Sequence, residues 1–193
     1  MDAESAIYLE TTLGLLRVRA SAKAIVAVEF VDETDEGPEP SDLAMEAARQ
    51  LAEYFTGVRR RFDLPLAPEG TAFQKRAWRE LRAIPYGRRT TYGAIAERLG
   101  DGGAARAVGA ATGANPLAIV VPCHRVVSAT GALTGYSHGV ARKKWLLVHE
   151  SRVAAGDPYV TLDIGPSRRL TPRGPPSETA PAPRKRDRSI GEW

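Results

Sequence analysis

The stretch TTYGAIAERLGDGGAARAVGAATGAN, residues 90–115, contains two short helical segments separated by a glycine-rich turn. Gly100 ends the first segment, and the second begins after Gly103 and consists mainly of alanine and other small residues. Two helices joined by a short turn that contains glycine are typical of a helix-turn-helix, whose second helix binds in a groove of DNA. Helical hairpins that do not bind DNA are also common. The flanking sequence is therefore needed to distinguish a DNA-binding helix-turn-helix from an ordinary helical hairpin.

The residues around this stretch predict a mainly helical, winged helix-turn-helix-like domain over residues 70–152. Upstream, the capping box of Thr71 and Gln74 predicts the start of a helix, and Pro85 predicts its end. Downstream, a run of branched apolar residues predicts a buried extended segment. The elements expected here are helices over 71–84, 90–100, 104–115 and 139–150, the extended segment LAIVVP at 117–122, and a turn around Thr130-Gly131.

Residues 1–69 predict a separate α/β domain made of a small sheet and one helix. The segments expected to form strands are YLETTLGLLRVRAS (8–21) with a turn at Leu13-Gly14, AIVAVEFV (24–31), and the first part of RRRFDLPLAPEG (59–70), which then becomes a linker. Ser41 is expected to cap a helix that runs to about Tyr54, because apolar residues recur at helical spacing after it.

The net charge of +4 is distributed unevenly along the chain. Residues 1–70 contain 7 Lys and Arg against 14 Asp and Glu, whereas residues 71–152 contain 13 against 4. A block this basic favours binding to a polyanion such as nucleic acid, although a charged run is more often a solvated surface. Residues 153–193 form a tail rich in Pro and Arg, and we expect it to be disordered from about residue 165.

Composition restricts the class of protein further. The chain has one cysteine, which excludes an intramolecular disulfide, a four-cysteine zinc site and a CxxC redox pair. The first residues, MDAESAIYLE, lack the basic and apolar segments of a signal peptide, and no apolar run is long enough to span a membrane. We therefore expect a cytoplasmic protein that does not bind a membrane.

The single cysteine, Cys123, lies in the segment NPLAIVVPCHRVV, directly before His124. A free cysteine is usually buried and inert, so its presence alone predicts no chemistry. A nucleophilic cysteine needs its thiolate, and a neighbouring imidazole oriented by a carboxylate favours that form. Glu150 is the only carboxylate between Asp101 and Asp157, so a Cys–His–Glu relay is available, although neighbouring positions in sequence do not prove hydrogen bonding.

These segments together resemble a known family. FQKRAWRELRAIPYGRRTTYGAIAERLG, AARAVGAATGANP, NPLAIVVPCHRVV and GALTGYSHGVARKKWLLVHE resemble the O6-alkylguanine-DNA alkyltransferases, the methylated-DNA–protein-cysteine methyltransferases. The resemblance runs from about Thr71 to Glu150, is looser over the N-terminal block, where EYFTGVRRRFDLPL is still similar, and does not extend to the tail. It implies an RNase H-like N-terminal domain, followed by a domain that binds DNA and accepts the alkyl group.

The resemblance implies direct, single-turnover DNA repair by a monomer. The protein would bind double-stranded DNA that contains O6-alkylguanine through the minor groove, and the damaged base would leave the stack. Arg106 matches the family's arginine finger, which fills the vacated space, and Ala105, Ala107 and Thr91 are expected to contact DNA. Cys123 would take the alkyl group as a thioether, and because the chain has no second thiol to remove it, each molecule would react once. No cofactor is then needed, because the thiol itself is the acceptor, and no metal is expected, since the chain has no spare cysteine for a zinc site.

The resemblance also implies roles for the residues around Cys123. Tyr92 would donate a proton or a hydrogen bond to the leaving base, His124 would act on Cys123 through a water molecule, and Glu150 would orient His124. The other residues assigned to the pocket or its support are Asn115, which ties the recognition helix to the active-site loop, Pro122, Arg125, Val126, Ser137 on the O6 side, and Tyr136 and Lys143, which order the substrate loop. Two simpler explanations remain for these last residues: plain packing for Tyr136 and plain surface charge for Lys143.

One position departs from the family pattern. Many relatives have a glycine pair after Tyr136-Ser137, whereas this chain has His138-Gly139. An imidazole there would narrow the pocket or add a titrating group near the leaving base. We therefore expect His138 to hinder the transfer of bulky O6 substituents more than the transfer of methyl.

Three other functions compete with repair: a noncatalytic sensor of alkylation damage with the same fold, a DNA-binding regulator, and a cysteine hydrolase. The presence of Cys123 speaks against the sensor, and an adjacent Cys-His pair does not supply the distant histidine that a hydrolase needs. The sequence does not predict the range of alkyl groups, activity on O4-alkylthymine, or a role for the tail.

Overall fold

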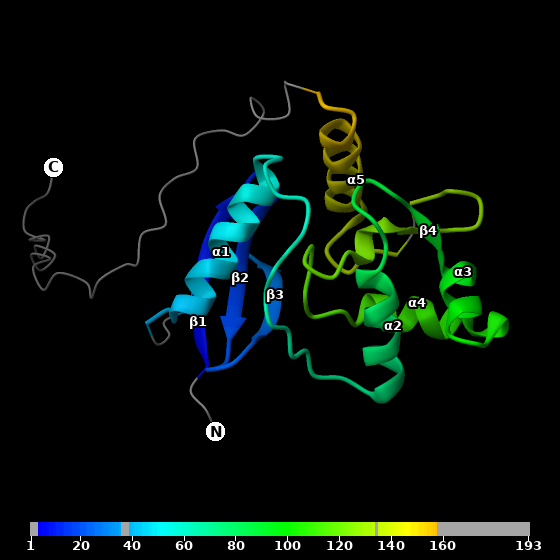
Figure 1. Ribbon diagram of the computed structural model, residues 1–193, viewed down its shortest axis with the longest axis horizontal. Helices are drawn as coiled ribbons and strands as arrows, with labels where there is room; N and C mark the ends of the chain where they lie inside the picture. The colour runs from blue at the N-terminus through cyan, green and yellow to red at the C-terminus, as the bar shows by residue number, and fades with distance from the viewer. Residues whose placement is uncertain (1–3, 36–38, 134, 158–193) are drawn as a thin grey trace, which may run out of the picture.

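The N-terminal part of the computed structural model is an antiparallel sheet of three strands with one helix against it (Figure 1). The structure describes residues 4–35, 39–133 and 135–157. The part of the tail that is expected to be disordered, from about residue 165, lies outside these described residues. The strands follow one another in chain order as β1 (Ser5–Thr11), β2 (Gly14–Ala20) and β3 (Ile25–Val31). Thr11 pairs with Gly14, so the turn at the predicted place spans only two residues.

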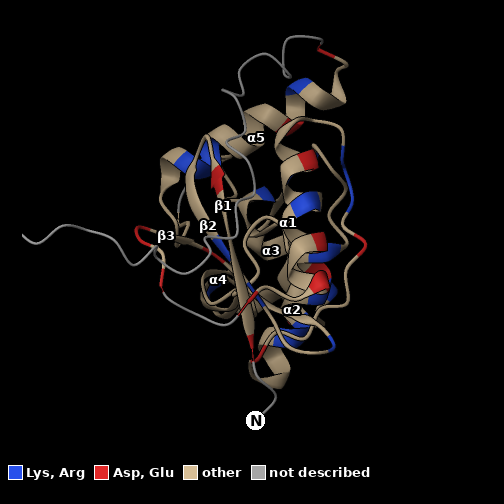
Figure 2. Ribbon diagram, turned by 90° about the vertical axis from the view of Figure 1, so that its left-hand side faces the viewer, with Lys and Arg blue, Asp and Glu red and all other residues tan. Residues whose placement is uncertain are grey.

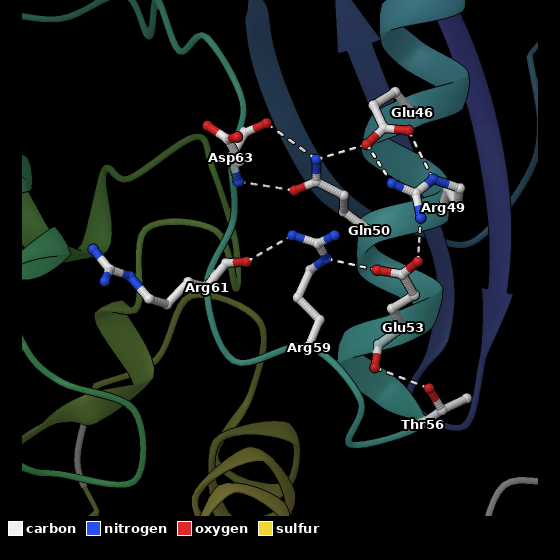
Figure 3. Close-up of polar contacts among 8 residues, drawn as sticks. All are labelled: Glu46, Arg49, Gln50, Glu53, Thr56, Arg59, Arg61 and Asp63. Atoms are coloured by element: carbon white, nitrogen blue, oxygen red, sulfur yellow. Dashed lines mark hydrogen bonds and ion pairs between the residues drawn. The ribbon is translucent and has the colours of Figure 1, made fainter.

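Helix α1 (Asp42–Phe55) lies across this sheet and begins where the sequence predicts. The Ser41 hydroxyl accepts a hydrogen bond from the Ala44 amide at 3.3 Å, which caps the first turn. One side of α1 is buried against the sheet, whereas its exposed side carries both acidic and basic residues (Figure 2). On that exposed side Arg49 pairs with both Glu46 and Glu53 (Figure 3).

The second part of the chain is mainly helical, as predicted. Its elements are α2 (Ala72–Arg82), α3 (Tyr92–Arg98), α4 (Ala105–Gly113) and α5 (Val140–Ala154), the short strands β4 (Thr90–Thr91) and β5 (Val126–Val127), and two single turns of 3₁₀ helix, η1 (Gly102–Ala104) and η2 (Cys123–Arg125). The strands β4 and β5 pair in parallel. Among the described residues, no helix is long and apolar enough to cross a membrane.

Helices α3 and α4 form the predicted helix-turn-helix, and α2 supports it. The Thr71 hydroxyl accepts from the Gln74 amide at 3.2 Å, and the Gln74 side chain accepts from the Thr71 amide at 2.8 Å, so the capping box is confirmed. The Trp78 indole donates to the carbonyl oxygen of Ala111 at 2.8 Å, which joins α2 to the end of α4. Gly100, at φ +86°, turns the chain after α3 in a conformation that suits glycine.

The predicted extended segment at 117–122 and the predicted strand at the start of residues 59–70 are both wrong. The segment LAIVVP pairs with the sheet only through a bridge between Leu117 and Val28, and then folds into buried turns. Its amides bond locally, from Val120 to Ala118 at 2.8 Å and from Val121 to Leu117 at 2.9 Å. Branched apolar residues are therefore buried here without a strand. Within residues 59–70, similarly, only Leu66 forms a bridge, to Ile25.

The two parts share one hydrophobic core and are also joined by polar contacts. Arg142 on α5 donates from Nε to the carbonyl oxygen of Leu13 at 2.8 Å, in the turn between β1 and β2. Its guanidinium also lies over the Phe30 ring of β3, at 4.6 Å from the ring centroid. These contacts fix the N-terminal sheet against the helix that carries the residues described below.

The capping box gives a first prediction. Replacing Thr71 with Ala removes the oxygen that accepts from the Gln74 amide, so we expect the free energy of unfolding to fall by about 1 kcal/mol in urea denaturation. Thr71→Ser is the control, because it keeps the hydroxyl and should retain most of the stability. Equal losses in the two variants would contradict the role given to the cap.

Candidate active site

The site is built around the buried carboxylate of Glu150, on α5. This carboxylate accepts five hydrogen bonds, all between 2.8 and 3.0 Å. The donors are the Tyr54 hydroxyl, the Gly87 amide, Nε2 of His124, and Nε and Nη2 of Arg125. Three separate parts of the chain are therefore fixed relative to α5 by one side chain.

The surroundings of Glu150 set the ionisation of the group and of His124. Burial alone would raise the pKa of Glu150, but the hydrogen bonds and charges of His124 and Arg125 outweigh it and hold this pKa far below its usual range. Burial lowers the pKa of His124, so its imidazole is neutral at pH 7. A carboxylate can only accept, so Nε2 of His124 carries the proton and Nδ1 has the free lone pair.

The Cys123 side chain is 4% exposed and adjoins this pair in the 3₁₀ turn η2. Burial raises the pKa of its thiol, whereas a hydrogen bond from Asn115 and the positive charge of Lys143 lower it. The resting group is therefore a thiol, and its attack on an alkyl carbon requires a base. Nδ1 of His124 is buried and has no hydrogen-bond partner among the described residues, which leaves it able to accept that proton.

Asn115 holds the turn that presents Cys123. Its Nδ2 donates to the Val121 carbonyl at 2.9 Å, to the Leu117 carbonyl at 3.3 Å and to Sγ of Cys123 at 3.2 Å. Its Oδ1 accepts from the Leu117 amide at 3.1 Å. Because Asn115 lies two residues after the end of α4, this side chain joins the segment that follows the predicted recognition helix to the cysteine turn.

Three further predicted residues lie close to the thiol or to the end of α4. The Tyr92 hydroxyl donates to the Gly135 carbonyl at 3.4 Å, and burial, together with the nearby Cys123, raises the pKa of this phenol. The Ser137 hydroxyl donates to the Gly113 carbonyl at 2.5 Å, so it ties the loop before α5 to α4. Burial, and to a lesser degree Cys123, also raise the pKa of Tyr136 above its usual range.

Lys143 and His138 differ from what the sequence alone suggests. Lys143 is fully buried, so plain surface charge is wrong as its explanation. Burial lowers the pKa of Lys143, and Cys123 acts against that shift when it is ionised. The His138 ring packs against Phe30 at 5.3 Å and against Tyr136 at 5.4 Å between centroids. His138 therefore reaches the N-terminal sheet as well as the substrate loop, and its effect on bulky substituents stays a prediction.

The residues expected to contact DNA lie on α4, except Thr91, which ends β4 directly before α3. Arg106 and Ala107 are exposed, Ala105 is half-buried, and the Arg106 guanidinium has no polar partner among the described residues. Thr91 caps α3 by accepting from the Ala94 amide at 3.2 Å. Its hydroxyl thus has a structural role, and its contact with DNA stays a prediction.

Sequence reasoning missed part of the network around Glu150. The helical spacing predicts Tyr54 only as the approximate end of a helix, although a buried tyrosine hydroxyl needs a partner. Gly87 follows the predicted helix end at Pro85, and no sequence pattern indicates its bond to Glu150. Its φ of +71° and the position of the Ala154 side chain, 3.1 Å from where a Cβ would stand, also require glycine. Arg125, predicted as part of the pocket or its support, is the ion-pair partner of Glu150 and donates to the Ile84 carbonyl at 2.6 Å, contacts that the sequence does not indicate.

No metal site is evident in the described parts of the chain, where no group of three His, Cys, Asp or Glu side chains could hold an ion.

Pro122 and Val126 flank the turn η2, and Val126 is fully buried in β5. The arrangement thus supports nucleophilic chemistry by a buried thiol with a neutral imidazole next to it.

Comparison with known proteins agrees with this architecture. The family model of the 6-O-methylguanine DNA methyltransferase ribonuclease-like domain matches residues 6–68, and that of the DNA binding domain matches residues 72–152. The methylated-DNA–protein-cysteine methyltransferase of Methanosarcina acetivorans is 44% identical over 144 residues, which cover 72% of this chain and 92% of that one. That of Mycobacterium tuberculosis is 41% identical over 77% and 93% of the two chains.

Solved structures give the same result. The Mycobacterium tuberculosis O6-methylguanine methyltransferase superposes with a TM-score of 0.72 at 40% identity, over 80% of this chain and 96% of that chain. A crystal structure of Mycobacterium tuberculosis OGT in complex with DNA superposes with a TM-score of 0.70, also at 40% identity, over 76% and 92% of the two chains. The fold is thus that of a two-domain protein with a ribonuclease-like and a DNA-binding part. The chain belongs to the 6-O-methylguanine DNA methyltransferase family.

The network around Glu150 gives a second prediction. Glu150→Gln removes the charge but keeps the size of the side chain, and we expect it to lower the free energy of unfolding by about 3 kcal/mol at pH 7, because Arg125 stays buried without its partner. The pKa of Glu150 is lower in the folded chain than in the unfolded one, so its stabilising effect is present above the unfolded value of about 4.3 and is lost in acid. The difference between the two proteins should therefore narrow below about pH 4.3.

Glu80→Gln is the matched control for this measurement. Glu80 pairs with Nε of Arg98 at 2.9 Å on the surface, where an ion pair contributes less than about 1 kcal/mol. Urea denaturation of the three proteins at several pH values makes the comparison. A loss in Glu150→Gln as small as that in Glu80→Gln would contradict the organising role of Glu150.

Proposed function

We propose that this protein repairs DNA by transferring the alkyl group of O6-alkylguanine to the sulfur of Cys123, once per molecule. The observation that carries the proposal is the position of Cys123. It is a buried thiol next to a neutral imidazole whose Nε2 donates to an ionised carboxylate 2.8 Å away. Membership of the 6-O-methylguanine DNA methyltransferase family supports the same substrate class.

Binding of double-stranded DNA would use the helix-turn-helix of α3 and α4. Exposed small residues on α4 allow the backbone of DNA to approach closely, and the Arg106 side chain extends from the same helix. The modified guanine would leave the stack, at a cost of a few kcal/mol, and Arg106 would occupy its place. Residues 70–152 are thus proposed as the domain that binds DNA and accepts the alkyl group. Residues 1–69 would support this domain, in part through the hydrogen bond from Tyr54 to Glu150.

The transfer itself needs one proton to leave the protein thiol and one to reach the base. A water molecule would carry the Cys123 proton to Nδ1 of His124, and the Glu150 carboxylate would stabilise the imidazolium that forms. The thiolate would then form a bond to the alkyl carbon while the bond from that carbon to O6 breaks. Tyr92 would give its proton to the guanine as it leaves, and it would regain one from the proton held on His124.

The product would be a thioether, which is a poor leaving group. Because the chain contains no other cysteine, it has no thiol that could attack the alkyl group and regenerate the enzyme. All the groups used in the transfer come from one chain, so a monomer is sufficient. No cofactor is required, because the acceptor is part of the protein.

Substitution of the nucleophile gives the third prediction. Cys123→Ala should lose transfer of methyl from a duplex that contains one O6-methylguanine, because the acceptor atom is gone, and should still bind this duplex in a gel-shift measurement. Arg106→Ala is the complementary variant and should keep the thiol but bind and react more weakly. Methyl transfer by Cys123→Ala would disprove the assignment. Tight binding without transfer by the wild-type protein would instead indicate a damage sensor or a DNA-binding regulator.

Tyr92 gives the fourth prediction. Tyr92→Phe removes the proton donor for the leaving base, and we expect the single-turnover rate constant at saturating duplex to fall by about 100-fold. Tyr8→Phe is the control, since it removes a hydroxyl from the N-terminal sheet and should leave the rate unchanged. If both variants react at the wild-type rate, Tyr92 does not assist the departure of guanine.

A further inference from the structure

A cavity of about 500 Å³ lies beside the cysteine turn, separate from the groups that act on DNA. It is lined by three segments of the described chain, within residues 60–62, 82–86 and 119–125. The described residues that line it do not include Cys123, Tyr92 or Arg106. The cavity is within the size range of sites for small molecules, so its lining indicates what it would bind.

Positive charge dominates this lining. Among the described residues, the charged side chains that line the cavity are all arginines, Arg60, Arg61, Arg82 and Arg125, with no Asp or Glu. Arg125 is neutralised by Glu150, whereas the Arg60 guanidinium makes a single hydrogen bond within the described chain, from Nη2 to the carbonyl oxygen of Val153 at 2.9 Å. Within the described residues, the Arg61 and Arg82 guanidinium groups have neither a hydrogen bond nor an ion pair. The cavity thus has three arginines without an acidic partner.

The neighbouring Arg59 shows what a structural arginine in this segment does. Its Nε pairs with Glu53 at 2.7 Å, and its Nη1 donates to the carbonyl oxygen of Arg61 at 3.0 Å. Figure 3 shows the two guanidinium groups on opposite sides, with Arg59 directed to α1 and Arg61 directed away from it. Ion pairs with α1 therefore account for Arg59 but not for Arg61.

The rest of the lining is apolar or aromatic and includes Phe62, Ile84 and Ile119. The hydroxyl of Tyr86 is buried at this cavity and has no hydrogen-bond partner among the described residues. Guanidinium groups match phosphate oxygens in geometry and charge, and an apolar wall suits a base or another flat group. We propose that this cavity binds a phosphate-bearing small molecule of nucleotide size.

The cavity adjoins the turn that carries Cys123. Ile119, which lines the cavity, has φ +70°, a conformation that is strained for a β-branched residue. Ile119 and Pro122 belong to the turn that ends at Cys123, so a bound molecule would contact this turn directly. The site is thus distinct from the DNA-binding helices but not remote from the reacting sulfur.

Titration of the full chain with ATP, followed by calorimetry at an ionic strength of about 0.01 M, tests this proposal, because screening is weak there. We expect saturable binding of one ATP, competition by inorganic pyrophosphate, and much weaker binding of adenosine, which has no phosphate. Arg61→Gln and Arg82→Gln should each weaken ATP binding by at least about tenfold. Arg79→Gln is the matched control, since it removes the same charge from α2 at an exposed position that does not line the cavity.

Three results would overturn the proposal. The first is the absence of saturable ATP binding by the wild-type protein. The second is an equal loss of binding in Arg79→Gln, which would mean that only the overall charge matters. The third is a loss of affinity for a lesion-free duplex as large as that for ATP in Arg61→Gln and Arg82→Gln, because the arginines would then belong to the DNA interface.

Discussion

The structure depends on one buried negative charge. Burying a carboxylate costs free energy unless hydrogen bonds and opposite charges replace its hydration. Glu150 accepts five such hydrogen bonds, two of them from the guanidinium of Arg125. One donor is Tyr54 of α1 and another is the backbone of Gly87, so the carboxylate joins the N-terminal part to the helical part. The same interaction that holds the fold together therefore also sets the position of His124 and Arg125.

This constraint determines the chemistry available to Cys123. With Nε2 of His124 committed to Glu150, only Nδ1 is left to accept a proton, and burial keeps the ring neutral and ready to do so. Asn115 acts from the other direction, because it bonds to both ends of the turn and to the sulfur itself. The thiol is thus held by a turn that is fixed at both ends. Burial raises the pKa of this thiol, so a base has to remove its proton before the sulfur can attack.

The sequence predicted the elements that depend on local signals. Ser41 and the Thr71–Gln74 capping box located two helix starts correctly, because a cap needs only neighbouring residues. The prediction of LAIVVP as an extended segment was wrong, since burial of branched residues does not reveal that Asn115 satisfies part of the backbone of this segment. The bond from Tyr54 to Glu150 joins residues 96 positions apart, and burial of Lys143 depends on the whole fold. Such contacts have no local pattern. The residues themselves indicate a possible relay of Cys123, His124 and Glu150, whereas only the family resemblance indicates the roles of the other residues around Cys123.

The central claim is that this buried constellation makes Cys123 the final acceptor of one alkyl group. The most direct test is the intact mass of the protein after incubation with an excess of duplex that contains O6-methylguanine, followed by peptide mapping. We predict a gain of one methyl group in place of the thiol proton, located on Cys123, with no further reaction when more duplex is added. Repair of several lesions by each molecule, or an unchanged mass with the lesion still bound, would contradict the account.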